Sequence, residues 1–254
     1  MAFVNNYVAP RRNEVDISLK EEYDNNSAVA VPPVLESPCV QVVPFHPLLH
    51  AKAFYTAYQN DAAAIHKYLP TEWPTFESFL TMIEAFIRSD PSCAIFTIID
   101  TTKAADSELS PRVTNGRVAG LIGWLHASTA HLTVEIGPVI VLPEFQRTHV
   151  TSNAIGLLLR YLLDIPADGG VGFRRVAWCA NPLNAASIVT AEKMGFVQEG
   201  VMRWTWVLPE GKEGKPVDGR RGKGNGRDSI LLALCWDDWV NGAKERVEKR
   251  MERV

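Results

Sequence analysis

The residues best suited to chemistry lie at a polar corner between two apolar patterns. A strand pattern ends at Pro143 and a helical pattern resumes near Val150, with the glycine-free turn EFQRTH between them. The first N–H groups of a helix have no intrahelical partner, and together with the helix dipole they form an anion site for which phosphate is the usual guest. Arg147 adds a positive charge. Further hydroxyl donors follow at Thr148, Thr151 and Ser152. The corner predicts a pyrophosphate site, and an ordinary solvent-exposed helix cap is the alternative.

The strand that leads into this corner is interrupted by Gly137-Pro138. Proline cannot donate a hydrogen bond to a neighbouring strand, so a continuous central strand is disfavoured there and a bulge is expected. A strand that bends away from its neighbour leaves unpaired backbone between the two. An extended ligand with amides can pair with that backbone, here Val139, Ile140 and Val141. The alternative is an edge strand with a bulge and no ligand.

The bulk composition fits one domain with some additional length for tails. The chain has 254 residues, of which 46% are hydrophobic, and a formal net charge of −3. This balance gives no global indication of nucleic-acid binding, although residues 211–227 hold six Lys/Arg against two acids. Four widely spaced cysteines without a C-x-x-C pattern predict free thiols. Without a signal-peptide or membrane-span pattern, we expect a cytosolic (cytoplasmic) protein.

Hydrophobic periodicity predicts a mixed order of strands and helices. Residues 1–36 are polar and aperiodic and are expected to form a flexible arm, followed by a domain over 37–240 and a C-terminal helix over 237–254. The Gly- and Lys/Arg-rich segment 209–227 is expected to be a mobile loop. Strand patterns cover 39–45, 93–100, 117–128, 132–142, 174–181, 200–208 and 229–236. Helical patterns cover 47–69, 75–89, a segment from about 150, and 184–196.

Antiparallel hairpins come first in this order and β-α-β crossovers come later. The predicted fold class is therefore α/β (mixed α+β), with one twisted mixed sheet of about seven strands. A splayed pair is expected at the Gly137-Pro138 break, and helices are expected to cover both faces of the sheet.

Two long segments carry a family resemblance. VEIGPVIVLPEFQRTHVTSNAIGLLL and RRVAWCANPLNAASIVTAEKMGFVQEGVMRW resemble the GNAT superfamily of acetyl-CoA-dependent N-acetyltransferases, in particular its RimJ/RimL-like branch, which acetylates protein N-termini and, in relatives, small amines. The resemblance extends over about residues 39–236. It implies that acetyl-CoA inserts at the splayed strands and that its pyrophosphate rests on the turn from Gln146 to Thr151. The implied turn residues are Gln146, Arg147, Thr148, His149, Val150 and Thr151.

The turn departs from the family pattern Q/R-x-x-G-x-G/A. His149 and Thr151 stand where the family has small residues. Backbone amides of non-glycine residues still donate at a helix N-terminus, provided that the side chains point outward. His149 is expected either to cover a phosphate or to be an exposed bystander.

Acyl transfer from a thioester to an amine requires a proton acceptor for the amine, a donor for the carbonyl oxygen and a proton for the thiolate. Glu135 is the best candidate base because it precedes the predicted bulge, where the amine would arrive. It can act directly or through a water molecule, and the resemblance implies an acid that orients such a water. The alternative is a strand-surface glutamate with no role.

The resemblance also implies roles for two residues of NPLNAASIVTAEKMGF. Asn184 is implied to bind the pantetheine arm, and the Ser187 hydroxyl is implied to lie near the sulfur as proton donor. Many other family branches use a tyrosine as this donor, but this stretch has none, so Ser187 takes the role. Asparagine and serine are also good helix caps, which is the alternative for both.

Other chemistries lack their required residues. His46 and His50 are four residues apart on a predicted helix, but no third metal ligand is evident, so no metal site is expected. No G-x-S-x-G sequence occurs, and GRRGKGNG lacks the spacing and the Ser/Thr of a P-loop.

The favoured function is acetyl transfer from acetyl-CoA to a primary amine by direct attack, with a peptide N-terminus or a small-molecule amine as acceptor. One alternative is a non-catalytic acyl-CoA-binding regulator. The other is an interaction module that docks loop 209–227 on an acidic surface such as ribosomal RNA.

Overall fold

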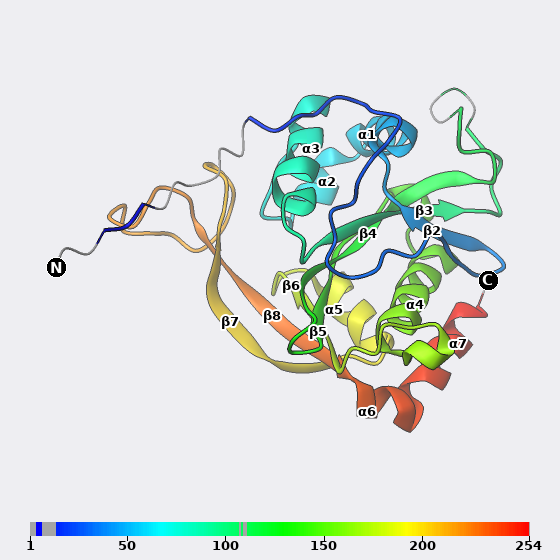
Figure 1. Ribbon diagram of the computed structural model, residues 1–254. Coiled ribbons are helices and arrows are strands. Elements are labelled where there is room, and N and C mark those ends of the chain that lie inside the picture. The colour runs from blue at the N-terminus through cyan, green and yellow to red at the C-terminus, as the bar shows by residue number, and fades with distance from the viewer. Residues whose placement is uncertain (1–3, 7–13, 107, 109–110, 254) are drawn as a thin grey trace.

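The computed structural model describes residues 4–6, 14–106, 108 and 111–253, and these form one mixed sheet with helices on both faces (Figure 1). The strands are β1 (Leu35–Glu36), β2 (Val40–Pro44), β3 (Ala94–Asp100), β4 (Arg117–Ser128), β5 (Thr133–Val141), β6 (Arg175–Ala180), β7 (Val197–Val207) and β8 (Gly226–Cys235). The α-helices are α1 (Lys52–Gln59), α2 (Ala62–His66), α3 (Phe76–Met82), α4 (His149–Leu163), α5 (Ala185–Lys193), α6 (Trp236–Asp238) and α7 (Lys244–Met251).

The eight strands of the described chain lie in the order β1-β2-β3-β4-β5-β6-β8-β7. Within this sheet β5 and β6 pair in parallel, and every other neighbouring pair is antiparallel. The predicted mixed sheet is confirmed, and each of the seven predicted strands is present. The two-residue strand β1 is additional and was too short to give a periodic signal.

The helices form two layers around the sheet. Helix α4 packs on β1 to β4 and β6, and α7 packs against α4 on the side away from the sheet (Figure 1). Helix α1 contacts β4 from the opposite face, and α2 and α3 contact α1 on that side of the sheet. Helix α5 lies against β6. The β5–α4 corner is therefore held by a strand that β4 pairs up to its last residue and by a helix packed between the sheet and α7.

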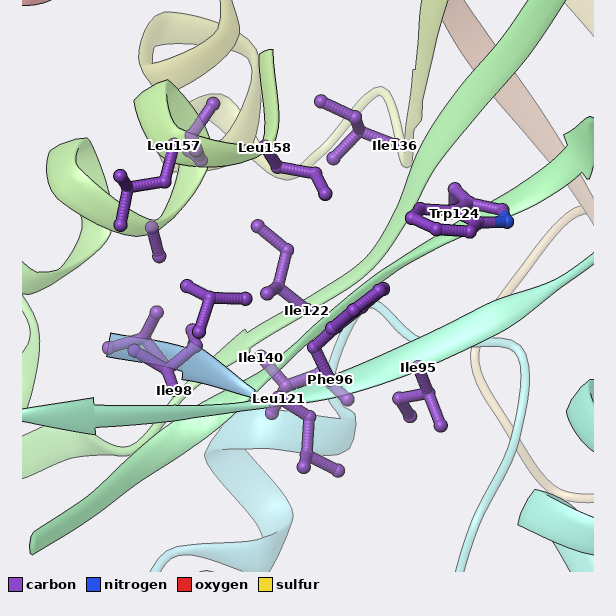
Figure 2. Close-up of a cluster of buried hydrophobic side chains, with 14 of the residues drawn as sticks. Ile95, Phe96, Ile98, Leu121, Ile122, Trp124, Ile136, Ile140, Leu157 and Leu158 are labelled. Carbon is purple, nitrogen blue, oxygen red and sulfur yellow. The ribbon is translucent and has the colours of Figure 1, made fainter. Parts of the chain in front are cut away.

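Alternation along the central strands produces a core on each face of the sheet. Figure 2 shows Leu157 and Leu158 of α4 above Ile122 of β4, whereas the neighbouring Leu121 points to the other face. All four side chains are at most 4% exposed. Successive residues of a strand point to opposite faces, so an uninterrupted apolar run such as that of β4 indicates a strand covered on both sides.

Residues 14–36, predicted as part of a flexible arm, lie along the domain. Val29 is 3% exposed, and the Tyr161 hydroxyl donates to the carbonyl oxygen of Ala30 at 2.6 Å. Strand β1 pairs with β2 at the end of this segment. Residues 1–3 and 7–13 lie outside the described residues. Flexibility of the arm in solution stays a prediction.

The segment predicted as a mobile loop is shorter than expected, because β8 already begins at Gly226. Lys215 and Gly226 exchange backbone hydrogen bonds, each with an N–O distance of 2.8 Å. The Lys212 ammonium donates to the carbonyl oxygen of Thr71 at 3.4 Å, so the loop contacts the segment between α2 and α3. The mobility of the remaining loop stays a prediction.

Two predicted helices are broken in the structure. The pattern over 47–69 is a π-helical turn (Pro47–Ala51) continued by α1, with α2 beginning after Asp61. The C-terminal pattern is divided at Gly242, whose φ of 113° belongs to the left-handed region that glycine favours. The apolar spacing continues across both breaks, so periodicity alone did not reveal them. Within the described residues, the helices are too short or too polar to cross a membrane, and the cytosolic location stays a prediction.

Gly120 sets the close approach of β4 and β5. A Cβ atom at this position would lie 2.2 Å from the backbone oxygen of Ile140, which cannot move aside as a side chain can. We predict that Gly120→Ala lowers the free energy of unfolding by about 1–3 kcal/mol, as overpacking does in other cores. Gly200→Ala in β7 is the control, since a Cβ atom there meets nothing within 4 Å. Urea denaturation of both variants measures the effect, and equal stabilities would contradict this account.

Candidate active site

The site is built where β5 and β6 separate. Their parallel ladder consists of Thr133 with Arg175, Val134 with Val176 and Glu135 with Ala177. Beyond Glu135, β5 continues on β4 to Val141, and β6 continues on β8 to Ala180, without further pairing between the two. We call this separation the fork. Its position, directly before Gly137-Pro138, is where the sequence predicted a splayed pair.

The bulge at the fork arises from the β4–β5 pairing. The register between these strands shifts between Ile122 and Trp124, opposite the Gly137-Pro138 peptide, which is cis. Past the bulge, the predicted ligand-pairing residues of β5 are again held by β4. The pairs are Val139 with Ile122, Ile140 with Leu121, and Val141 with Gly120. Their backbone is thus fixed on the β4 side, while the β6 side is free of a strand partner.

The polar corner follows directly from β5. A short 3-10 turn (Pro143–Phe145) leads to Gln146, whose side-chain amide donates to the carbonyl oxygen of Val141 at 2.9 Å. Arg147 has a φ of 62°, in the left-handed region, and its side chain is exposed. The corner therefore uses a backbone conformation that glycine usually adopts, but the residue in that conformation carries a guanidinium side chain. In the part of the chain that the structure describes, this guanidinium has no ion-pair partner.

Thr148 caps helix α4. Its hydroxyl oxygen accepts from the N–H of Val150 at 3.3 Å, and its hydroxyl donates to the carbonyl oxygen of Phe145 at 2.7 Å. The side chain of Thr148 is thus committed to the cap that was the alternative to anion binding. The N–H of Val150 is used by this cap, so the predicted contribution of the turn to phosphate binding depends on the other backbone N–H groups, including those of Thr148 and Thr151.

The side chain of His149 is largely buried, so His149 is not the exposed bystander that was one of its two expected roles. Its side chain is 11% exposed, and its Nε2 lies 3.2 Å from Oδ1 of Asp100 at the end of β3. Asp100 is itself 2% exposed and also accepts from the N–H and the hydroxyl of Thr102, at 2.9 and 2.7 Å. The side chain that replaces a small family residue is therefore directed into the domain, which leaves the outer side of the corner open.

Glu135 lies at the fork and is paired with a residue that sequence reasoning missed. Its Oε2 is 3.3 Å from Nδ1 of His126, and its side chain is 18% exposed. The hydrogen bond that the protonated ring donates to the Glu135 carboxylate raises the pKa of His126, whose side chain is 66% exposed. His126 follows the β4–β5 bulge with a φ of 55°. Leu125 pairs with Glu135, and this register brings the next residue, His126, close to the Glu135 carboxylate. The hairpin between β4 and β5 determines the register.

A row of polar side chains extends from Glu135 across the same face of the sheet. The pairing of Glu135 with Ala177 and alternation along β6 place Cys179 on this face. Burial raises the pKa of the Cys179 thiol to about 12, so it is protonated and not a nucleophile. Arg227 of β8 belongs to the same row and is 8% exposed. It was assigned to a mobile loop from the sequence and was therefore missed.

Asn184 and Ser187 lie on the opposite face of β6 from Glu135. Asn184 caps α5, since its Oδ1 accepts from the N–H of Ser187 at 3.1 Å. The Ser187 hydroxyl oxygen accepts from the indole N–H of Trp178 at 3.0 Å. Trp178 lies between Ala177 and Cys179 on β6 and so points away from their face. The structure thus brings Glu135 and Ser187 to the two sides of the fork.

The two histidines that were weighed as metal ligands have a structural role. Nδ1 of His50 accepts from the backbone N–H of His46 at 2.9 Å. Burial lowers the pKa of His50 to about 4, so the ring is neutral and serves as an acceptor at the start of the first helical segment.

Comparisons with known proteins agree with this arrangement. A profile for the acetyltransferase (GNAT) domain matches residues 40–197. A GCN5-related N-acetyltransferase from Brucella melitensis is 22% identical, with 86% of this chain and 85% of that chain covered and a TM-score of 0.68. RimJ from Mycobacterium smegmatis, in complex with CoA-disulfide, is 16% identical over 83% and 88% of the two chains, with a TM-score of 0.59. No curated protein matches the sequence significantly.

A further solved structure with the same fold is the spermidine N-acetyltransferase from Vibrio cholerae, in complex with CoA and spermine. It is 15% identical over 80% of this chain and 98% of that chain, with a TM-score of 0.55. These low identities show a shared fold. The domain match, in contrast, covers more than half of the 254 residues, and the chain therefore belongs to the GNAT acetyltransferase family. Its enzyme class is that of the acyltransferases.

The pair at the fork makes a prediction about ionisation. Glu135→Gln removes the negative charge that favours protonated His126, so the pKa of His126 should fall toward its ordinary value near 6.5. In the wild type His126 should stay protonated to a higher pH than in the variant. Titration of the His126 ring signals by NMR measures both values. The exposed His131 provides an internal reference, and an unchanged His126 titration would disprove the coupling.

Proposed function

We propose that this protein moves an acetyl group from acetyl-CoA to a primary amine by direct attack in a ternary complex. The acceptor is a peptide N-terminus or a small-molecule amine, as expected for the RimJ/RimL-like branch. The observation that carries the proposal is the fork itself. The β5–β6 ladder ends at Glu135 and Ala177, leaving backbone unpaired between a candidate base and a helix N-terminus.

The cofactor side of the proposal rests on β5 and the corner. In this proposal Val139, Ile140 and Val141 offer backbone groups to the amides of the pantetheine arm. Two features of the corner suit a pyrophosphate: the exposed Arg147 charge and the first N–H groups of α4. The Nδ2 group of Asn184 remains free to donate, because the helix cap uses the side-chain oxygen of that residue.

The acceptor side of the proposal rests on Glu135. The amine must lose a proton as its nitrogen bonds to the acetyl carbon and the carbon–sulfur bond breaks. Glu135 takes this proton directly or through a water molecule, and His126 fixes the carboxylate in place. Ser187 gives its proton to the departing thiolate, since the bond from Trp178 uses the hydroxyl oxygen as acceptor and leaves its O–H free to donate.

The Glu135–His126 pair also favours an enzyme over a non-catalytic regulator. Cofactor binding needs the corner and β5, and neither requires a carboxylate on the far face of the fork. Glu135 nevertheless lies at the fork, with its side chain 18% exposed and its carboxylate beside His126. Its position is explained if it meets the amine.

Cofactor binding should stabilise the protein through Arg147. A ligand at a hundred times its dissociation constant adds about 2.7 kcal/mol, so CoA should raise the melting temperature. Arg147→Ala and Arg147→Gly should both shrink this rise, and Arg147→Lys should keep most of it. The glycine variant is the matched control for the left-handed backbone, because it accepts a φ of 62° without strain. A full CoA effect in Arg147→Gly would show that the charge has no role.

Turnover should depend on the carboxylate at the fork. Glu135→Gln keeps the size of the side chain but takes no proton, so kcat should fall by about 10²–10⁴-fold while CoA affinity changes little. Because Glu135→Gln also removes the charge that raises the pKa of His126, the pH profile of the variant should differ from that of the wild type. Steady-state assays that detect the free thiol across pH measure both effects. A variant within about threefold of wild type, with the same pH profile, would remove Glu135 from the mechanism.

A further inference from the structure

Arg227 is a buried cation that forms no salt bridge with a carboxylate of the described residues, although the charge of Glu135 acts on it. Only 8% of Arg227 is exposed to solvent, yet its hydrogen bonds go to neutral oxygens. Nε donates to the carbonyl oxygen of Asp228 at 3.2 Å, and Nη2 donates to the Ser229 hydroxyl at 3.4 Å. Burying a charge is costly unless an opposite charge compensates it, and arginine is rarely buried alone. Such a group is expected to have a partner that comes from outside the chain.

Arg227 is placed on the acceptor side of the fork. Leu231 of β8 pairs with Cys179, and alternation puts Ser229 and Arg227 on the same face as Leu231. This is the face of Glu135. Burial lowers the pKa of Arg227, and the charge of Glu135 opposes that change, so the two side chains are within electrostatic reach of each other. The Trp206 ring lies 6.0 Å from the guanidinium carbon and covers it from β7.

A second cation lies beside Arg227. The side chain of Lys212 is 10% exposed, and its ammonium is 3.7 Å from Oε1 of Glu72. Burial lowers the pKa of Lys212, and the Arg227 charge lowers it further. Glu72, at 54% exposure, is mostly in solvent and offsets one of the two charges at most. Two partly desolvated cations side by side leave a local excess of positive charge between the β7–β8 loop and the α2–α3 segment.

We propose that Arg227 and Lys212 bind a carboxylate of the acceptor, so that the preferred substrate is an amine that carries an acidic group. This inference rests on the proposed acetyl transfer and names the substrate class for it. A guanidinium binds a carboxylate through two parallel hydrogen bonds, and the Lys212 ammonium adds charge. The site disfavours polyamines, because a second ammonium would meet two buried cations.

The strand spacing indicates where the acidic group lies on the acceptor. Arg227 precedes Leu231 by four positions, which is about 13 Å along a strand, and Leu231 is level with Cys179 near the fork. The arginine side chain shortens this span. A free α-amino acid separates its amine and carboxylate by a single carbon atom. A peptide with an acidic side chain close to its N-terminus spans the distance better.

The test compares acceptors that differ in one charge. Three peptides that begin Ser-Glu, Ser-Gln and Ser-Lys, together with free glutamate and spermidine, are assayed with acetyl-CoA. We expect the Ser-Glu peptide to have the highest kcat/KM, by about 30-fold or more over the Ser-Gln peptide, as for a buried charge pair with one partner removed. Preference for free glutamate over Ser-Gln would support the carboxylate site and identify a small-molecule source.

Three variants locate the preference. Arg227→Gln and Lys212→Gln should raise KM for the Ser-Glu peptide and leave the Ser-Gln peptide nearly unchanged. Arg221→Gln is the matched control, since this arginine of the same loop is 81% exposed and pairs with Asp218. A rise of the melting temperature with CoA shows that each variant is folded. If Arg227→Gln does not fold, Lys212→Gln alone tests the inference.

The outcomes separate this inference from the proposed function. Equal kcat/KM for the three peptides, or a preference for spermidine, would overturn the carboxylate site while acetyl transfer stands. A preference for Ser-Glu that persists in both Arg227→Gln and Lys212→Gln would also overturn it. No acetylation of any amine, together with no thermal effect of CoA, would overturn the proposed function and the inference with it.

Discussion

The active-site geometry depends on one short stretch of hydrogen bonding, the three-residue parallel ladder between β5 and β6. The ladder holds the two halves of the sheet together up to Glu135 and Ala177, and the Gly137-Pro138 bulge then turns β5 away. A proline has no N–H to donate, so the separation is built into the chain. The base, the free backbone of β5 and the helix N-terminus all take their positions from this point.

The fork also divides the chemistry between two faces of the sheet. Glu135 and His126 lie on the face covered by α1 to α3, and Ser187 lies on the other face with Trp178. Acyl transfer needs a proton acceptor on the amine side and a proton donor on the thiolate side of the same carbonyl carbon. In the proposed mechanism, the end of the β5–β6 ladder lets Glu135 and Ser187 act from the two faces without contacting each other, so each keeps its own hydrogen-bond partner.

The polar corner has no glycine, whereas the family that this chain belongs to usually has small residues there. Arg147 adopts the left-handed conformation at a cost of about 1–2 kcal/mol. His149 avoids the outer surface by pairing with the buried Asp100. The direction of the His149 side chain is thus set by a contact with a strand residue 49 positions earlier in the chain.

The sequence by itself determined the strands, the fold class and the place of the fork, because alternation, helical periodicity and a proline within a strand are local signals. It also gave Glu135, Ser187 and the corner as candidates, and their roles stay predictions. The partners of these residues were decided by tertiary structure. His126 reaches Glu135 through the β4–β5 register, and Asp100 reaches His149 across the sheet. The sequence predicts a loop around Arg227, because the neighbouring residues are polar and rich in glycine. In the structure, β8 pairs with β7 as far as Gly226, and Arg227 is buried. Burial and charge pairing depend on which distant segments meet, and no local pattern records that.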